Sequence, residues 1–241
     1  MSLPDVQKMY EVIESTWPPA STRKIGNVTL REGRGGGKRV SAATVDGALD
    51  PQKLPDFEAA MRAMDQPALF MIRDGQEVLD MQLADAGYEV IDPVTMYAAP
   101  AQDIASEVPP RTAAIAAWEP LQIMLEIWQA GGIGAGRIEV MKRAEGPKTG
   151  FISRWNDHPA GTSFMAVHDG VGMVHALEIL PSQRRQGVAR WLMRRAAFWT
   201  LARGGHTLAV ICTTANQGAN ALYSSLGMTV VGQYHYRIKQ D

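Results

Sequence analysis

The stretch LEILPSQRRQGVARWLM, Leu177–Met193, joins a short apolar run to a helix through two arginines, a glutamine and a glycine. Pro181 ends strand pairing because proline has no backbone N–H. The helix that follows begins with N–H groups that have no partner inside the helix. Gly187 permits close approach to the backbone, and Arg184 and Arg185 add positive charge beside the helix N-terminus. The stretch therefore predicts an anion site that suits a diphosphate.

Composition limits the classes of protein to consider. The 241 residues can bury a large core, and 24 Lys+Arg against 25 Asp+Glu give a net charge of -1. That balance argues against a nucleic-acid partner. No apolar run reaches the roughly 18 residues of a membrane span, and the N-terminus does not read as a signal peptide. The single Cys212 excludes an intrachain disulfide and a cysteine metal cluster. We therefore expect a cytoplasmic protein without a membrane partner.

Hydrophobic periodicity and Gly/Pro positions predict an alternation of helices and strands. In the first hundred residues we expect a helix over 7–15, two strand-like runs separated by GRGGG, a helix, a strand, a helix ending at Gly87 and an extended segment. Residues 100–112 have no clear period and predict a linker. Two helices, three strands, a long helix over 185–203, a strand, a helix and a closing strand follow.

Two blocks of this sequence resemble the GCN5-related N-acetyltransferase (GNAT) superfamily. Its signature is Arg or Gln, two residues, Gly, one residue, then Gly or Ala, and Arg184–Ala189 matches it. The later block NQGANALYSSLGM, residues 216–228, carries the family's Asn, Ala, Leu-Tyr and Gly, with Met228 in place of the usual aromatic residue. The resemblance covers about residues 115–237. It implies an α/β fold with a mostly antiparallel central sheet flanked by helices.

The resemblance also implies a site for acetyl-CoA as co-substrate, with no metal. The strand ending at Ile179 would splay from its neighbour and pair with the pantetheine arm, backbone amides from Arg185 onward would hold the pyrophosphate, and Asn216 would hold the arm. The cofactor-binding residues so assigned are Leu177, Ile179, Leu180, Arg184, Arg185, Gln186, Gly187, Val188, Ala189, Asn216 and Ala219.

Three residues are candidates for catalysis. The resemblance places Tyr223 near the sulfur, where it would protonate the departing thiolate. The segment VHALEI is similar to the strand of serotonin N-acetyltransferase in which a histidine at the position of His175 is a proposed base. Glu178 is the alternative base, and strand alternation predicts that it faces away from His175. A hydrogen-bonded histidine and a solvated glutamate would explain both residues equally well.

The first hundred residues lack the glycine signature but share an order of elements with the second half. LADAGYEVIDPVTMYA and YSSLGMTVVGQYHYRI both run from a helix through glycine into a strand. We therefore predict a tandem, duplicated fold: a degenerate GNAT-like unit over 1–100, a linker over 101–112 and a catalytic unit over 113–241. The first unit would shape the acceptor site. The alternative is that the first unit is an unrelated α+β domain, since a junction of helix, glycine and strand is common in proteins.

Two glycine-rich segments resemble nucleotide loops without their context. GGIGAG, Gly131–Gly136, follows a helix rather than a strand, which favours a mobile turn beside the acceptor pocket. GRGGGKR, Gly33–Arg39, lacks the ending of a phosphate loop and favours a flexible turn.

The function expected is transfer of an acetyl group to a primary amine by direct attack in a ternary complex. Strand amides near Ile179 would stabilise the developing negative charge. A small-molecule amine is favoured over a protein amine, and the chain would act as a monomer or homodimer. A binding module that has kept the acyl-CoA groove but lost catalysis is the alternative.

Overall fold

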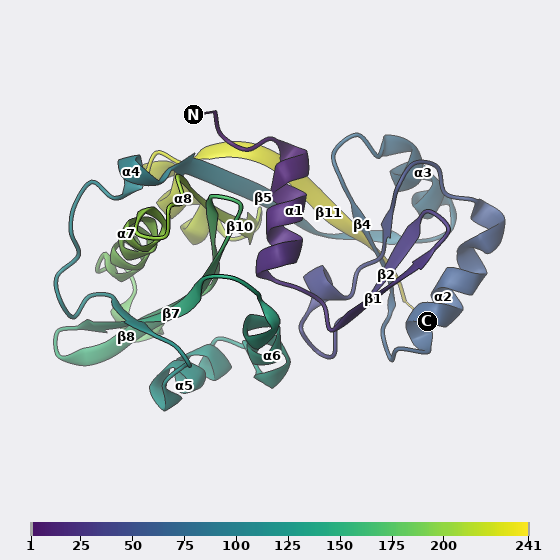
Figure 1. Ribbon diagram of the computed structural model, residues 1–241. Coiled ribbons are helices and arrows are strands. Elements are labelled where there is room, and N and C mark those ends of the chain that lie inside the picture. Colours follow the sequence, from purple (N-terminus) through teal and green to yellow (C-terminus); the bar gives the residue numbers. More distant parts are fainter. Residues whose placement is uncertain (1, 241) are drawn as a thin grey trace.

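The computed structural model describes residues 2–240, which form a mixed α/β fold (Figure 1). The helices are α1 (Val6–Thr16), α2 (Leu54–Arg62), α3 (Glu77–Asp85), α4 (Ala101–Ile104), α5 (Gln122–Ala130), α6 (Ala135–Arg143), α7 (Val188–Leu201) and α8 (Gln217–Ser225). The strands are β1 (Ser21–Ile25), β2 (Val28–Glu32), β3 (Thr44–Val45), β4 (Ala68–Ile72), β5 (Glu89–Pro100), β6 (Ile115–Ala117), β7 (Lys148–Trp155), β8 (His158–His168), β9 (Val171–Ile179), β10 (Thr207–Thr213) and β11 (Thr229–Lys239).

One large sheet organises the molecule. Its strand order is β4-β11-β5-β10-β9-β8-β7-β6, and β1-β2-β3 form a small second sheet. Within the large sheet β9 and β10 are parallel, and the other neighbours are antiparallel. A parallel bridge between Ala43 and Phe70 joins the small sheet to β4. The expected mostly antiparallel sheet flanked by helices is confirmed.

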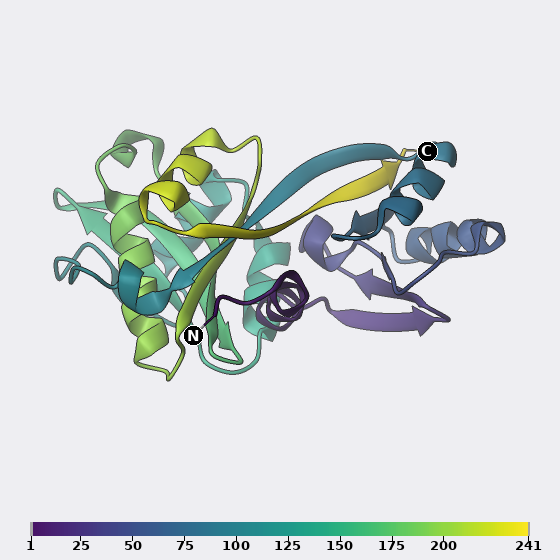
Figure 2. The same cartoon turned by 90° about the horizontal axis from the view of Figure 1, so that it is seen from above.

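The long strands β5 and β11 cross between the two halves of the chain. β5 lies between β10 and β11, where Tyr97 pairs with Val210 on one side and Val230 on the other. β11 lies between β5 and β4, and its last residues pair with β4 on the edge away from β5, where Tyr236 opposes Met71. Figure 2 shows these two strands as a paired ribbon that spans the molecule. Each half of the chain therefore contributes a strand to the sheet of the other half.

β9 and β10 separate before β9 ends. Their pairing covers only Thr207–Val210 of β10 and Val171–Val174 of β9. β9 continues to Ile179 with β8 as its sole partner strand among the described residues. The second half of β9 therefore has a free edge toward β10.

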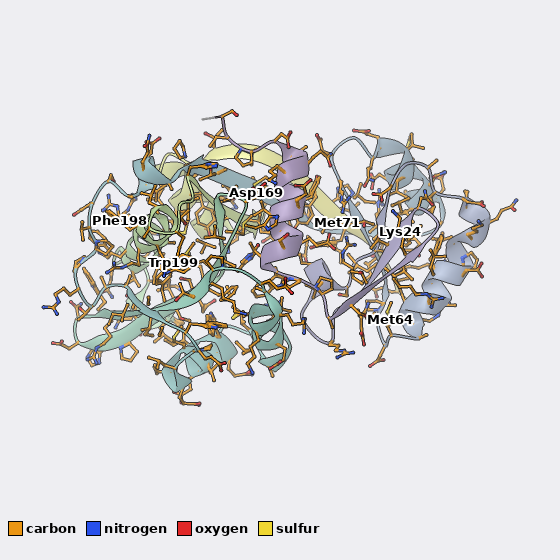
Figure 3. The ribbon with its side chains drawn as sticks, in the orientation of Figure 1. Lys24, Met64, Met71, Asp169, Phe198 and Trp199 are labelled. Carbon is orange, nitrogen blue, oxygen red and sulfur yellow. The ribbon has the colours of Figure 1, made fainter. Side chains whose placement is uncertain are left out.

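Helices cover both faces of the sheet. α7 and α8 pack on one face, where Leu192, Met193 and Tyr223 belong to one buried cluster. The amphipathic α1 packs on the other, against β8, β9 and β11, and buries Met9 and Ile13. Asp169, in the turn between β8 and β9, lies beside α1 and forms an ion pair with Lys8 (Figure 3).

Several expected boundaries differ from the structure. The run GKRVSAATV was expected to be a strand, but Lys38–Val40 is a 3-10 turn and only Thr44–Val45 pairs with β2. The long helix starts at Val188 rather than Arg185, because residues 185–187 form the turn before it. The linker contains the short helix α4. The division into residues 1–100 and 113–241 remains a prediction, and both α1 and β5 pack within the second unit.

The exchange of strands predicts that residues 113–241 do not fold alone. Without β5, strands β10 and β11 lose their common partner and expose two unpaired edges. We expect this fragment to aggregate and to show no cooperative thermal transition by circular dichroism. Coexpression with residues 1–112 should restore a soluble complex that unfolds cooperatively. A fragment that unfolds alone near the midpoint of the full chain would contradict this expectation.

Candidate active site

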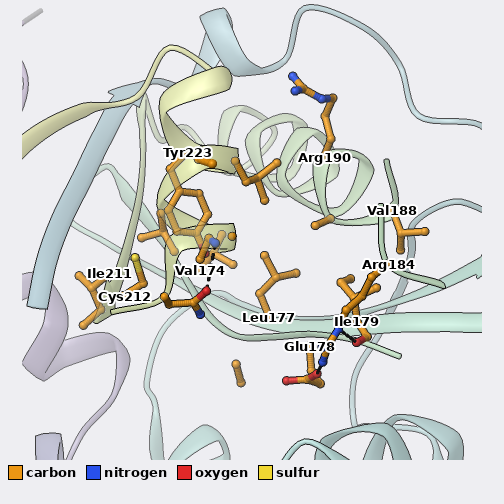
Figure 4. A pocket seen from close by; sticks show the side chains of 18 of the residues that line it. Val174, Leu177, Glu178, Ile179, Arg184, Val188, Arg190, Ile211, Cys212 and Tyr223 are labelled. Carbon is orange, nitrogen blue, oxygen red and sulfur yellow. Dashed lines mark hydrogen bonds and ion pairs between the residues drawn. The ribbon is translucent and has the colours of Figure 1, made fainter. Parts of the chain in front are cut away.

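A cavity of about 890 Å³ occupies the gap between β9 and β10 (Figure 4). Its walls come from the end of β9, the turn into α7, β10 and α8. Tyr223 and Cys212 lie on one side of the cavity and Arg184 and Glu178 on the other, with Leu177 between them. This volume lies within the range of cofactor sites, about 300–1,000 Å³.

The turn into α7 presents unpaired backbone donors. Within residues 2–240, the N–H groups of residues 185–190 have no hydrogen-bond acceptor. Arg185 (φ 63°) and Gly187 (φ 81°) are both left-handed, and such turns gather successive N–H groups into an anion-binding concavity. Val188 anchors the helix in the core. Gln186 is exposed and hydrogen-bonds to the carbonyl of Ser182.

Arg190 was not predicted from the sequence and lies beside this turn. It lines the cavity from the first turn of α7, and its Nη2 donates to Ser225 Oγ over 2.9 Å. The sequence did allow this prediction, because Arg190 is three residues after Gly187 and so lies one helical turn from the predicted anion site.

Leu177, Ile179 and Leu180 were predicted to pair with the cofactor through their backbone groups, and the structure places the first two at the cavity. Leu180 does not fit: its N–H donates to the carbonyl of Ala160 and its own carbonyl accepts from Gln183 N–H, so both groups are used. This corrects the expectation for Leu180. Because backbone groups alternate sides along a strand, those of Leu177 and Ile179 point away from β8 toward the gap.

A β-bulge at Ala176 changes which side chains share a face of β9. His175 opposes Phe164 and Glu178 opposes Thr162, so β9 holds one residue more than β8. Ala176 has φ 50°, and its carbonyl accepts a hydrogen bond of 2.7 Å from Trp128 Nε1 on α5. His175 and Glu178 therefore lie on the same face. The expectation of opposite faces was wrong because simple alternation fails across a bulge.

His175 is only 4% exposed, and both of its ring nitrogens are engaged. Arg39 Nη1 lies 3.0 Å from Nδ1, and an arginine can only donate, so Nδ1 accepts. Nε2 then carries the proton and donates to Thr16 Oγ1 over 2.9 Å, while that hydroxyl donates to the carbonyl of Val12. Burial, and then Arg39, hold the His175 pKa well below its usual value. These contacts count against His175 as a base.

Glu178 lies at the cavity wall near the end of α5. Its Oε1 accepts from Arg184 Nη2 over 3.2 Å, and Arg184 Nε donates to the carbonyl of Ile179. Gly131 makes room for it, because a Cβ atom there would lie 2.6 Å from the Glu178 Cδ. The glycine-rich segment after α5 thus touches the candidate base.

Two asparagines organise the start of α8. Asn216 caps the helix, with its Oδ1 accepting from Ala219 N–H, so its amide NH₂ remains available to the cavity. Asn220, which the sequence reading missed, donates to the carbonyls of Thr213 and Asn216. Its Oδ1 accepts from the Tyr97 hydroxyl of β5 over 2.8 Å. A strand from the first half therefore supports this wall.

Tyr223 is buried on α8, and its hydroxyl has no hydrogen-bond partner among the described residues while its side chain lines the cavity. Its ring lies 5.5 Å from that of Tyr97. Burial is the main cause that raises the Tyr223 pKa, and neighbouring Cys212 and Tyr97 add to it. The phenol therefore stays protonated at neutral pH and can donate to a group in the cavity.

Residues 116–228, which contain the splayed strands and the turn into α7, match the Acetyltransferase (GNAT) family. These residues form a GNAT acetyltransferase domain. The chain is therefore an acyltransferase. It is 24% identical over 98% of its length to the uncharacterized N-acetyltransferase YobR of Bacillus subtilis, of which 99% is covered.

Solved structures share the fold across both halves. A GCN5-related N-acetyltransferase from Kribbella flavida has a TM-score of 0.72 and 18% identity, over 100% of this chain and 97% of its own. A tandem GNAT protein from the clavulanic acid biosynthesis pathway has a TM-score of 0.63 and 12% identity, over 95% of this chain and 86% of its own. Among the described residues no helix is long and apolar enough to cross a membrane, and no cluster suits a metal ion.

The buried, neutral His175 predicts a loss of stability in acid. Because its folded-state pKa is lowered, the unfolded chain takes up a proton below about pH 6.5 that the folded chain does not. The stabilisation by His175 relative to His175→Gln should be complete above that pH. Below that pH this stabilisation should fall by up to about 1.4 kcal/mol for each unit by which the pH is lowered.

Urea unfolding of both proteins between pH 7.5 and 5 measures this difference. The exposed His158 provides the control, because His158→Gln should keep the wild-type pH dependence. Equal pH dependence in wild type and His175→Gln would show that the histidine titrates normally.

Proposed function

We propose that the protein is an acetyl-CoA-dependent N-acetyltransferase that acetylates a primary amine by direct attack in a ternary complex. One observation carries the proposal: a single cavity joins the free edge of β9, the unpaired N–H groups before α7 and the unpartnered hydroxyl of Tyr223. Together these features supply a hydrogen-bonding edge, an anion site and a proton donor.

The residues present fit the cofactor. The N–H groups from Arg185 to Ala189 would bind the pyrophosphate, with positive charge from Arg185 and Arg190. The backbone groups of Leu177 and the N–H of Ile179 would pair with the amides of the pantetheine arm, and the Asn216 amide would hold that arm. Bound acetyl-CoA supplies a thioester, whose acetyl carbon bonds to the amine nitrogen as its bond to sulfur breaks.

Two side chains would move the protons. Tyr223 would give its hydroxyl proton to the leaving sulfur, since its raised pKa keeps it protonated. Glu178 would accept the proton that the amine nitrogen loses, directly or through water, and Arg184 would orient its carboxylate. His175 would hold Arg39 and Thr16 in place instead of acting as the base. Holding amine and thioester side by side would supply much of the rate.

The first half of the chain would act as a structural and substrate-shaping unit in a tandem arrangement. Parallel pairing of Ala43 with Phe70 resembles that of β9 with β10, and apolar side chains of Leu49, Phe57 and Met61 fill the space beside it. The likeness to a tandem GNAT structure over 95% of this chain supports this division. The exchanged strands would let one chain act as a monomer.

The anion site predicts that Arg185→Glu weakens binding of acetyl-CoA. The new carboxylate would repel the diphosphate, and we expect the Kd to rise at least about tenfold in calorimetric titration. Arg203→Glu makes the same charge change beyond the other end of α7, outside the cavity, and should bind normally. Unchanged binding by Arg185→Glu, or no binding by the wild type, would refute the cofactor site.

The assignment of the acid predicts that Tyr223→Phe binds acetyl-CoA normally but turns over slowly. Loss of the donor should lower kcat about 100-fold, whereas the Kd of acetyl-CoA stays within about twofold. The matched variant Tyr88→Phe removes a tyrosine hydroxyl outside the cavity, where it donates to Glu58, and it should retain most of the activity. Product formation with a responsive amine measures both variants. An unchanged kcat in Tyr223→Phe would remove the tyrosine from the mechanism.

A further inference from the structure

A second cavity of about 220 Å³ adjoins the first and shares five residues with it: Arg39, Ala176, Ile211, Cys212 and Thr213. Its walls come from both halves of the chain: the segment before and within the first 3-10 turn, α6, the bulge of β9, and β11. The end of the glycine-rich turn, Gly36 to Arg39, therefore supplies part of this wall.

Two arginines give this cavity an uncompensated positive charge. Lys38 is paired with Asp92 over 2.8 Å, but neither Arg39 nor Arg137 has a carboxylate partner within residues 2–240. The Arg137 guanidinium makes no hydrogen bond to any described residue, and the Nε of Arg39 is buried without an acceptor. Burial, and then the charge of Arg39, lower the Arg137 pKa.

Such an arrangement is costly unless an anion completes it. Half-buried guanidinium groups that repel each other and have no carboxylate partner lose hydration with little compensation. Arg39 is fixed from two sides, by His175 Nδ1 and by the Trp17 ring 5.5 Å away. Arg137 lies against Gly37, where a Cβ atom would come within 3.3 Å of its Nε. The two donors are therefore held in position rather than free in solvent.

The charged pair lies close to the candidate base. Arg39 contacts His175, and His175 and Glu178 stand on one face of β9, opposite residues that are two apart on β8. Residues two positions apart along a strand are separated by about 7 Å, which is therefore the approximate distance between His175 and Glu178 along β9. A molecule that reaches from the arginines to Glu178 is therefore short. The aromatic residues Trp17, Tyr234 and Tyr236 line the remaining wall and suit an apolar portion.

We propose that the acceptor is a small amine that also carries a carboxylate, held by Arg39 and Arg137 with its amino group toward Glu178. This assignment rests on the proposed acetyl transfer. The planar forks of two arginines match a carboxylate, and the small cavity limits the size of the molecule. In the reaction the nitrogen–acetyl bond forms and the acetyl–sulfur bond breaks. The nitrogen loses a proton to Glu178, and the sulfur gains one from Tyr223.

Matched pairs of acceptors test the assignment. Phenylalanine with phenethylamine, and leucine with isoamylamine, differ only in the carboxylate. We expect the wild type to acetylate the amino acids with a kcat/KM about 10- to 100-fold above that of the paired amines. Arg137→Gln should remove this preference, mainly by raising KM for the amino acid. Arg39→Gln should also remove the preference. Lys142→Gln, which changes an exposed cation on the same helix as Arg137, should keep it.

Direct binding separates this proposal from the proposed function. The protein loaded with CoA is titrated with each amino acid in a calorimeter, which requires no turnover. Binding that depends on Arg137 without any acetyl transfer would support the carboxylate site and refute the reaction. Equal or better turnover of the amines, or of a lysine side chain in a peptide, would overturn the carboxylate site and keep the reaction. Amino acids that neither bind nor react would also overturn it.

Discussion

The pairing of β5 with both β10 and β11 is the constraint on which the structure depends. It joins strands that are more than a hundred residues apart in sequence, and it makes one sheet from the two halves of the chain. It also completes the acetyltransferase domain, because Tyr97 of β5 supports Asn220 and packs against Tyr223. The wall of the cavity opposite β9 is therefore formed by β10 and α8 but supported by a strand of the first half.

Local chemistry explains why much of the site could be predicted from the sequence. The turn around Gly187 is set by a few adjacent residues, so its unpaired N–H groups could be foreseen from Pro181, the arginines and the start of α7. The helices likewise followed from apolar spacing and glycine stops. The exchange of β5 and β11 could not be foreseen, because both strands have the same character and nothing local tells a strand which edge it will join.

The missed features share one property, which is that they depend on contacts between distant residues. Ala176 is an ordinary alanine, and its bulge is recognised only from the register with β8 and the hydrogen bond from Trp128. The partners of His175, which argue against its role as a base, come from residues 16 and 39. A histidine on a strand can serve as a base or as a structural group, and its neighbours in space decide between them.

The contact of Arg39 with His175 has a consequence for how such an enzyme can diversify. The groups that would carry out the chemistry lie on β9 and α8, whereas the segment Gly33–Arg39, which helps to shape the smaller cavity, belongs to the other half of the chain. If the smaller cavity holds the acceptor, as we propose, changes in that segment would alter which molecules are accepted without changing the residues of β9 and α8. A half that has no cofactor signature of its own can thus be retained by selection as a replaceable recognition element.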